Sequence, residues 1–323
     1  MSGTASGAAT VAPAPVAVAS AASAYYRRRK IAFTLKLQPV TDPRTGTLVS
    51  PKFAHNGKAE ATFTGLRCNV VIQKFGYVSQ SPLSMRVFGL PLSVMNDIAT
   101  LGRLPLAGRN NTITVSAGDD EAGMSVVYTG TIQNAWADFQ SAPDVALNID
   151  GQIGLYAAQA STEATSYDGA ADASVILSGL AVRMGRTFQN NGVTAQLSNP
   201  YFHGTLLDQL HSCVAAADVD FEDDGVTIFI WPKNGSRGGT PPLISPQTGL
   251  VGYPTYNRNG IALLTLYNPL IGRGGLIKVE SSLIPASGLW RVYSLTHTLD
   301  SETHNGPWFS YLQASEPPYA AVR

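Results

Sequence analysis

The chain has 323 residues, of which 44% are hydrophobic and 14% are charged, and its 22 basic residues balance its 22 acidic ones. This length supports two or three domains with separate cores. Zero formal charge argues against a partner that is bound by neutralising nucleic-acid phosphates. A charged fraction below the usual value of about a quarter favours a surface that is buried against other subunits.

Two cysteines, Cys68 and Cys213, lie far apart in the sequence and inside apolar patterns. We expect buried thiols rather than a disulfide or a pair of metal ligands, so nothing demands an oxidising compartment. No apolar run reaches the roughly 18 residues that are needed to cross a bilayer. The sequence therefore predicts no membrane span.

The first 29 residues differ from the rest in composition. Met1–Ala24 consists mostly of small residues and lacks the basic start and continuous apolar centre of a secretory signal. Such a segment buries too little area to offset its ordering entropy, so we expect residues 1–29 to be an extended arm held by a neighbouring chain. The arm ends in Tyr25-Tyr26-Arg27-Arg28-Arg29-Lys30. These cations could bind nucleic acid or a membrane, but so short a run beside a strand favours an inter-subunit face.

Residues 30–160 have the two-residue period of β-strands. Ile31, Phe33, Leu35 and Leu37 alternate with more polar residues, which predicts a strand with one buried face. Further strands are predicted over 66–73, 84–90, 111–116, 125–133 and 145–155, with a short helix over 91–101 and a bend or bulge at Gly151. These elements together predict a strand-rich domain over residues 30–160.

The period becomes helical after residues 157–172, which are rich in Ala, Ser, Thr and Gly and are typical of a linker. Ile176, Leu180, Met184 and Phe188 are spaced by four residues and would form one apolar stripe of a helix. The sequence therefore predicts a helix that begins soon after the linker.

A second helix and a hairpin follow. Thr205 and Asp208 have the spacing of a capping box, which predicts a helix start. Asp223-Asp224-Gly225 favours a tight turn between strands over 219–222 and 226–231. We expect residues 165–233 to form an α+β middle domain.

The last quarter of the chain again has short strands that are punctuated by Gly, Pro and Asn. The predicted elements are a turn over Gly249–Pro254, strands over 261–269, 276–281, 288–295 and 307–312, a turn over 272–275, and an acidic loop after residue 295. We expect a second small antiparallel barrel over residues 240–318.

One loop gathers four groups that could do chemistry. His297, Asp300, Glu302 and His304 lie within eight residues and could bind a divalent metal or supply an acid and a base. Their spacing matches no helical zinc pattern, and the residues between them are mostly polar. We therefore favour a surface turn over a site.

The other candidate groups are explained better by structure than by chemistry. They are the pair His211 and Cys213, the acidic group Asp220, Glu222, Asp223 and Asp224, the turn Gly272-Arg273-Gly274-Gly275, and the tryptophans Trp136, Trp231, Trp290 and Trp308. Residues two apart on a helix face different sides, and a Gly-rich turn without Lys-Ser/Thr is not a phosphate loop. The tryptophans could form a sugar platform, but strand patterns favour core or interface positions. With no Gly-x-Ser-x-Gly or His-Glu-x-x-His motif, we expect no catalytic residue, no metal and no cofactor.

The C-terminal block also resembles a known family. Its motifs are, in order, Gly252-Tyr253-Pro254, Tyr267-Asn268-Pro269, a strand after Gly274-Gly275, Leu289-Trp290-Arg291-Val292-Tyr293 and Gly306-Pro307-Trp308-Phe309. This order is similar to the closing barrel of baseplate hub proteins from contractile-tailed phages. Shorter motifs, such as Phe88-Gly89-Leu90 with Met95-Asn96, resemble the first barrel of the same family.

The resemblance implies an α+β fold dominated by β-structure, with two small tail-tube-like antiparallel β-barrel domains that flank a helix–helix–hairpin unit. It also implies a structural virion protein without enzymatic activity. In this family-based picture, a homotrimer with two like barrels per chain forms a pseudo-six-fold ring between the hexameric tail tube and the trimeric central spike. The implied location is the phage tail baseplate, after assembly in the host cytoplasm.

The implied partners are further copies of the chain, the tail tube or tube-initiator protein, the central spike protein and other baseplate proteins. The residues expected to anchor the fold or an interface are Tyr253, Pro254, Tyr267, Trp290, Tyr293, Trp308 and Phe309, with Tyr25, Arg27, Arg28 and Arg29 in the inter-subunit arm. The alternative is a phage-associated carbohydrate-binding or hydrolytic module that acts on the cell envelope through residues 297–304 or the tryptophans.

Overall fold

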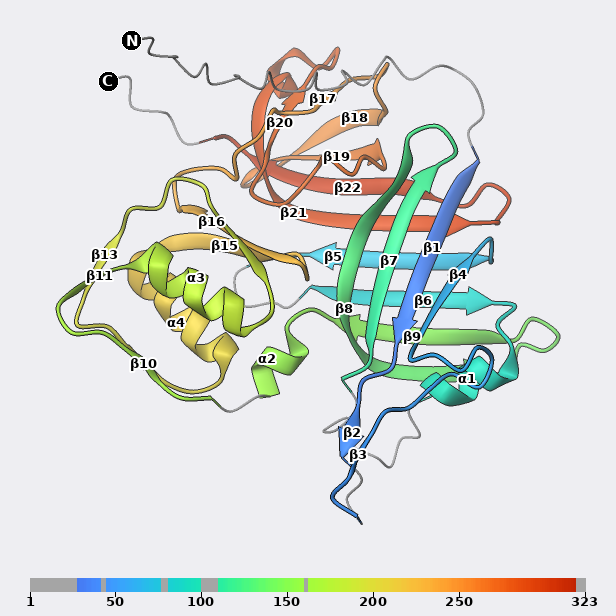
Figure 1. Ribbon diagram of the computed structural model, residues 1–323. Helices are drawn as coiled ribbons and strands as arrows, with labels where there is room; N and C mark the ends of the chain where they lie inside the picture. The colour runs from blue at the N-terminus through green and yellow to red at the C-terminus, as the bar shows by residue number, and fades with distance from the viewer. Residues whose placement is uncertain (1–27, 42–44, 77–80, 100–109, 160–161, 318–323) are drawn as a thin grey trace, which may run out of the picture.

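The computed structural model of the protein describes residues 28–41, 45–76, 81–99, 110–159 and 162–317 (Figure 1). Its largest element is a 13-stranded sheet. The main path of this sheet runs in the order β18 (Leu250–Asn257), β19 (Gly260–Leu266), β22 (Trp308–Ser315), β21 (Gly288–Ser301), β5 (Cys68–Lys74), β6 (Pro82–Phe88), β9 (Ala146–Gln152), β8 (Gly123–Asp138), β7 (Thr112–Asp119), β1 (Arg29–Lys36) and β4 (Glu60–Thr64). Beside β21, β20 (Leu276–Val279) and β17 (Leu243–Ile244) extend it. The predicted β-dominated α+β class is confirmed.

The N-terminal half of this sheet folds over itself into two layers. β8 pairs with β7 through its first half and with β9 through its second half, and its register shifts between Ile132 and Asn134. Figure 1 shows β1 and β7 crossing in front of β5 and β6. The first hydrophobic core is drawn from both layers and includes Phe33, Val70 and Leu147. One bent strand therefore connects the two layers that enclose this core.

The predicted alternation in the first strand is confirmed. Ile31, Phe33 and Leu35 of β1 are 2%, 1% and 0% exposed. The residues between them are less buried. A period of two places alternate side chains on one face of a strand, and here that face lies against the core.

Gly151 lies at the predicted irregularity, but the extra residue belongs to the partner strand, since the β8–β9 register shifts between Ile132 and Asn134, opposite Gly151 and Asp150. Gly151 pairs with Leu83 on one side and Ile132 on the other, within a regular stretch of β9. A Cβ atom at this position would lie 3.2 Å from the hydroxyl of Tyr128. Close packing of the buried Tyr128 therefore explains this glycine, and the irregularity of the ladder lies in β8 instead.

The two halves of the sheet are joined by β21, which is 14 residues long. It pairs with β20 through its first residues and with β5 through Leu295–Ser301. Leu295 belongs to the C-terminal core, whereas Leu299, four residues later on the same face of β21, belongs to the N-terminal core. A strand that spans about 46 Å at 3.3 Å per residue is long enough to reach both cores.

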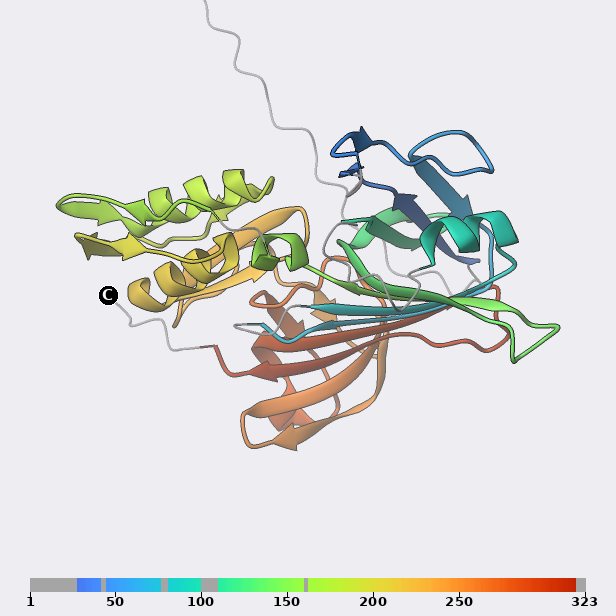
Figure 2. The same ribbon diagram turned by 90° about the horizontal axis from the view of Figure 1, so that it is seen from below.

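This junction corrects the picture of two separate barrels. The strands of residues 30–160 and 240–318 form one continuous sheet, and among the described residues no strand pairing closes either half into a barrel. Figure 2 shows the orange strands β18 and β19 on the opposite side of the sheet's middle strands from the blue strands β1 and β4. The ranges 30–160, 165–233 and 240–318 stay predictions as independent domains.

Two C-terminal elements also differ from their predictions. The expected turn over Gly249–Pro254 is mostly strand, because β18 begins at Leu250. The strand has a register shift between Val251 and Thr255, and Gly252 in this stretch has a φ of 69°. The expected acidic loop after residue 295 is also mostly strand, since β21 continues to Ser301. In that stretch, polar residues alternate with buried ones and so keep the period of two.

The middle unit packs two helices on a small sheet and lies beside the large sheet in both views (Figures 1 and 2). The helices are α3 (Ala173–Arg183) and α4 (Leu206–Ala217), and the strands, in sheet order, are β12 (Thr187–Asn190), β16 (Thr227–Pro232) and β15 (Val219–Asp223). The predicted capping box is confirmed: Thr205 accepts from the backbone N–H of Asp208, and the Asp208 carboxylate accepts from that of Thr205. The predicted hairpin is confirmed as β15 and β16.

The first helix of this unit is shorter than predicted. Met184 caps α3, Gly185 turns the chain at φ 69°, and Phe188 lies in β12. Ile176 and Leu180 are buried in the core of the unit, as predicted. Phe188 continues the spacing of four residues only by coincidence, because the left-handed backbone of Gly185 has already ended the helix.

The remaining elements are short. They are β2 (Val40–Thr41), β3 (Leu48–Val49), α1 (Leu92–Ile98), α2 (Leu155–Gln159), β10 (Thr165–Ser166), β11 (Ala170–Asp172), β13 (Gln196–Ser198), β14 (Tyr201–Phe202) and the 3-10 helix η1 (Ile284–Ala286). Cys68 and Cys213 are free and buried, as predicted. Within the described ranges, no helix has both the length and the apolarity to cross a membrane.

Candidate functional site

His297, the first member of the predicted polar loop, is a core residue. It lies in β21, is 3% exposed, and its Nδ1 is 2.8 Å from the Oγ of Ser310 on β22. Its ring packs edge-on against Tyr267 at a centroid distance of 5.3 Å. Burial, aided by the nearby Lys74 cation, lowers the pKa of His297 to about 3, so the imidazole is neutral at physiological pH.

The other three residues of this group do not gather around His297. Asp300 lies near the end of β21 opposite Asn69, and burial raises the pKa of its carboxyl group despite a hydrogen bond from Asn69. Glu302 is in the following turn and pairs with Arg28, and His304 is exposed. Among the described residues, no group of three His, Cys, Asp or Glu side chains could hold a metal ion. The residues of 297–304 are divided between a strand and a turn.

The helical pair His211 and Cys213 is divided between two environments, as expected. The His211 ring packs on Phe221 at 5.5 Å, whereas the Cys213 thiol is fully buried in the core of the middle unit. Burial raises the pKa of Cys213 to about 12, so the thiol stays protonated and unreactive.

Two acidic residues of the β15–β16 hairpin accept hydrogen bonds from the backbone of the turn, and a third takes part in ion pairs. Asp224 accepts from the backbone N–H groups of Val226 and Thr227, at 2.9 and 2.7 Å. Asp223 accepts from the backbone of Gly225 at 2.8 Å. Local backbone bonds therefore account for these two carboxylates, as the Asp-Asp-Gly pattern predicts.

Glu222 forms the centre of a buried cluster between the middle unit and the large sheet. It is 5% exposed; its Oε2 lies 3.1 Å from Nη1 of Arg237, and its Oε1 lies 4.0 Å from Nζ of Lys74. Close by, Arg273 is 7% exposed and donates to the carbonyl of Phe221 at 2.8 Å. Burial lowers the pKa of Arg273, opposed by Glu222. Arg273 of the predicted Gly-rich turn therefore connects the C-terminal half of the chain with β15 of the middle unit.

The residues that the sequence predicts as anchors of the fold or of an interface differ in how far they are buried. Trp290 is 6% exposed and donates from Nε1 to the carbonyl of Ala286 at 2.9 Å. Trp308 is also 6% exposed and contacts Tyr267 edge-on at 5.7 Å. Pro254 is buried, and Tyr267, Tyr293 and Phe309 are half-buried. Tyr253, in contrast, is 71% exposed on β18.

The tryptophans do not form a sugar platform. Trp231 is 1% exposed on the face of β16 that meets Arg273 and Gly274, and only Trp136 of the four is substantially exposed, at 46%. A platform for a sugar ring needs accessible aromatic faces. Three of the four residues are instead enclosed by protein.

Part of the arm lies on the C-terminal half of the sheet. Arg28 pairs with Glu302 at 2.7 Å, and the guanidinium of Arg29 lies 5.9 Å from the Trp308 ring centroid. Tyr25 and Arg27 lie outside the described residues. Arg28 and Arg29 therefore hold the start of β1 near the β21–β22 turn.

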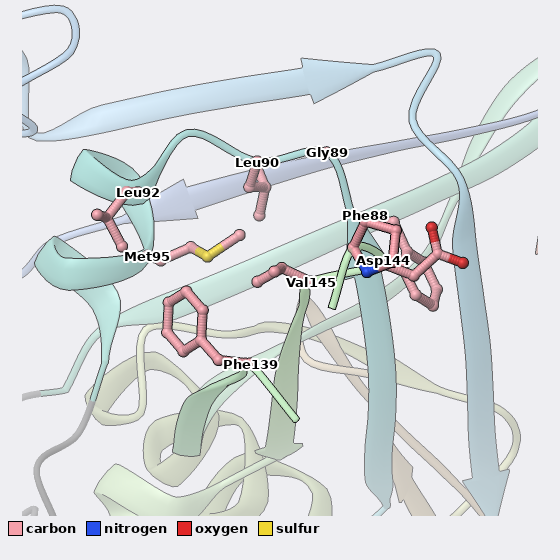
Figure 3. Close-up of a pocket in the computed structure, with 9 residues that line it drawn as sticks. Phe88, Gly89, Leu90, Leu92, Met95, Phe139, Asp144 and Val145 are labelled. Atoms are coloured by element: carbon pink, nitrogen blue, oxygen red, sulfur yellow. The ribbon is translucent and has the colours of Figure 1, made fainter. Parts of the chain in front are cut away.

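An apolar groove lies between α1 and the loop that connects β8 to β9 (Figure 3). Its volume is about 400 Å³, and its lining residues include Phe88, Leu92, Met95, Phe139 and Val145. Leu92 and Phe139 are 56% and 54% exposed. The sequence pattern did not identify this groove, because its lining comes from two separate segments, residues 88–95 and 139–145. The one available signal was Phe139 with Pro143, an aromatic and a proline in an otherwise polar connection.

The described residues offer candidate binding surfaces. Among the titratable side chains with large pKa shifts, His297 and the two cysteines are enclosed in cores. Exposed features of the described residues include the edge strands β18 and β4 and the groove beside α1. Exposed sheet edges and apolar grooves are features through which proteins bind other chains.

Solved structures share this fold. A 43 kDa tail protein of prophage MuSo2 from Shewanella oneidensis is 10% identical, with a TM-score of 0.53, and the match covers 88% of this chain and 96% of that one. A tail protein from Neisseria meningitidis is 9% identical, with a TM-score of 0.54 and the same coverage. An E. coli component of the type VI secretion system, described as similar in structure to the T4 tail proteins gp27 and gp5, is 12% identical, with a TM-score of 0.53 and coverage of 80% and 75%.

Comparison of the sequence with curated proteins found no match. The family model described as baseplate hub gp41, however, matches residues 53–312, which is most of the chain and includes both halves of the large sheet. This match agrees with the motifs around Tyr253, Trp290 and Trp308. The chain therefore belongs to the baseplate hub gp41 family.

Proposed function

We propose that this chain is a homotrimeric baseplate hub whose pseudo-six-fold ring connects the hexameric tail tube to the trimeric central spike of a phage virion. Its role is structural rather than enzymatic. Its partners are two further copies of itself, the tail tube or tube-initiator protein, the central spike protein and neighbouring baseplate proteins. The particle is assembled in the host cytoplasm and carries the hub in its tail baseplate.

The observation that supports this proposal most is the open sheet. Its main path ends at β18 on one side and at β4 on the other. An edge strand presents unpaired backbone N–H and C=O groups, which a neighbouring chain can pair. Because the two edges differ, a contact between β18 of one copy and β4 of the next is head-to-tail, and such a contact closes into a ring when the rotation permits.

The two halves of the sheet support the change from three-fold to six-fold symmetry. Each half has its own core, and β21 passes through both. If each half presents one similar face to the tube, three chains present six. Such an arrangement would need no extra subunit, because both faces would come from one chain.

Mass photometry tests the oligomeric state directly. The purified chain should give a particle of three times its 34.1 kDa mass, either alone or together with the spike protein. A stable monomer that binds neither the tube nor the spike protein would refute the proposal. A reconstruction of the whole particle should place the chain on the tail axis, between tube and spike.

The alternative, a module that binds or cleaves envelope carbohydrate, has less support. His297 is enclosed, and three of the four tryptophans are buried. A glycan-binding or hydrolysis assay with the purified chain distinguishes the two functions, because activity lost on Asp300→Ala would favour the module.

A further inference from the structure

The groove beside α1 exposes apolar surface that water solvates poorly. Figure 3 shows Leu92 and Met95 of α1 facing Phe139 and Val145 across it. Met95 is buried, at 4% exposed, whereas Leu92 and Phe139 are each more than half exposed. Two large apolar side chains around an open apolar floor are typical of a surface that another segment covers.

The charges around the groove are already paired with one another. Arg67 and Asp144 approach to 3.3 Å, and Arg86 and Asp138 approach to 3.1 Å. Both guanidinium groups also lie near the ring of Phe88, at 3.7 and 5.1 Å. The four charges sum to zero, so a charged occupant would have to compete with existing pairs. This rim favours an uncharged, apolar occupant.

The chain itself contains a segment with this chemistry. Residues 1–26 include no Asp, Glu, Lys, Arg or His, and the apolar part is Val11-Ala12-Pro13-Ala14-Pro15-Val16-Ala17-Val18. Its prolines favour a polyproline II helix, which has three residues per turn. In that conformation Pro13 and Val16 share one edge, and Pro15 and Val18 share the next. Grooves lined by aromatic side chains bind such segments, because a preformed extended helix loses little entropy on binding.

The arm is long compared with β1. Residues 19–27 separate the apolar segment from Arg28 and span about 30 Å when extended. Figure 1 shows β1 running toward the end of the sheet where α1 lies. The eight residues of β1 cover about 27 Å. Residues 19–27 are therefore long enough to run alongside the whole of β1, towards the end of the sheet where α1 lies.

We propose that the groove between α1 and the β8–β9 loop binds residues Val11–Val18 of the N-terminal arm of this chain. The occupant lies extended, with its prolines against Phe88 and Phe139 and its valines toward Leu92 and Met95. This inference concerns a site that the proposed ring and its tube and spike contacts do not require.

Photo-cross-linking in the full chain tests the proposal. A photoreactive amino acid in place of Leu92 should cross-link to residues 10–20, and mass spectrometry identifies the product. The same amino acid in place of Ile284, which is 80% exposed in η1, is the matched control and should give no such product. Cross-links from position 92 to another baseplate protein in the assembled particle, and none to residues 10–20, would overturn the proposal.

A binding experiment gives a second readout. The full chain with Pro13→Asp and Pro15→Asp should leave the groove empty and bind a labelled peptide of residues 10–20 at least tenfold more tightly than the unmodified chain does. Adding Leu92→Asp and Phe139→Asp should abolish that binding, whereas adding Ile284→Asp should not. Equal binding by the groove variant and the Ile284→Asp variant would contradict the proposal.

The outcome can be separated from that of the proposed function. Mass photometry of the same samples reports the oligomeric state. A trimer whose groove does not bind the peptide would leave the hub function intact and remove this inference. A monomer that binds the peptide would refute the hub function and support this inference.

Discussion

Nδ1 of His297 lies 2.8 Å from Oγ of Ser310, directly across the β21–β22 pair, and the two side chains are 3% and 0% exposed. The neutral imidazole has one N–H donor and one acceptor, so it can pair with the Ser310 hydroxyl without a buried charge. A residue that looked like part of a polar loop is therefore a neutral hydrogen-bonding group of the core. Its environment makes the stability of the fold depend on pH.

His297 should destabilise the protein as the pH falls from about 6.5 towards 3. The pKa of His297 is lowered to about 3 in the folded chain, so the unfolded chain binds the proton more readily between these values. Stability from this group is complete above the unfolded pKa and decreases by up to about 1.4 kcal/mol per pH unit below it. Urea unfolding from pH 7 to pH 4 measures this slope.

The matched variant for this test is His297→Gln, which keeps a polar side chain opposite Ser310 but does not titrate. Its difference in unfolding free energy from the unmodified chain should shrink as the pH falls. A difference that stays constant across the range would show that His297 is not the titrating group.

Glu222→Gln should destabilise the fold by about 3–5 kcal/mol, because removing one charge of a buried pair leaves the other uncompensated. The cation left behind is Arg237, whose guanidinium lies 3.1 Å from the Glu222 carboxylate. The control is Glu280→Gln, which breaks an ion pair with Lys278 whose side chains are 58% and 51% exposed. That change should cost at most about 1 kcal/mol. Similar losses in both variants, measured by urea unfolding, would argue against a buried cluster between the two units.

Gly225→Ala should reduce stability more than Gly192→Ala does. Both glycines have nearly the same positive φ, 91° and 92°, so both substitutions strain the backbone by about 1–2 kcal/mol. A Cβ at residue 225 would also lie 1.8 Å from the backbone carbonyl of Thr129 on β8, whereas residue 192 has no atom within 4 Å. The extra loss therefore measures the contact between the hairpin of the middle unit and the large sheet. Equal losses in thermal unfolding would mean that this contact is loose.

Tyr253→Ala should weaken assembly and leave the folded chain stable. Tyr253 is 71% exposed on the edge strand β18, so its removal should change the unfolding free energy by less than about 0.5 kcal/mol. Aromatic side chains at interfaces often contribute 2 kcal/mol or more, which corresponds to about a thirtyfold weaker association. Dilution experiments by mass photometry measure the dissociation of the trimer.

Trp290→Ala should have the opposite effect. Trp290 is 6% exposed in the C-terminal core, and deletion of a buried tryptophan costs about 3–5 kcal/mol of stability. Loss of assembly without loss of stability in this variant would contradict its assignment to the core. Together, the two variants separate the anchors of the fold from those of the interface.

Local sequence determined the elements whose signals are short-range. The alternation of Ile31, Phe33 and Leu35 specified β1, and the Thr205 and Asp208 pair specified the start of α4 through two hydrogen bonds within four residues. The Asp-Asp-Gly turn specified the β15–β16 hairpin for the same reason, since its carboxylates bond to backbone groups two or three residues away.

Tertiary structure decided the features that depend on which strands meet. The pairing of β21 with β5 joins residues 295–301 to residues 68–74, and no local period encodes a partner more than two hundred residues away. That pairing turned two expected barrels into one sheet and placed His297 in a core instead of a loop. The groove beside α1 likewise exists only because two separate segments, residues 88–95 and 139–145, pack together. Periodicity fixes which face of a strand is buried, but the neighbour that buries it is chosen by the packing of the whole chain.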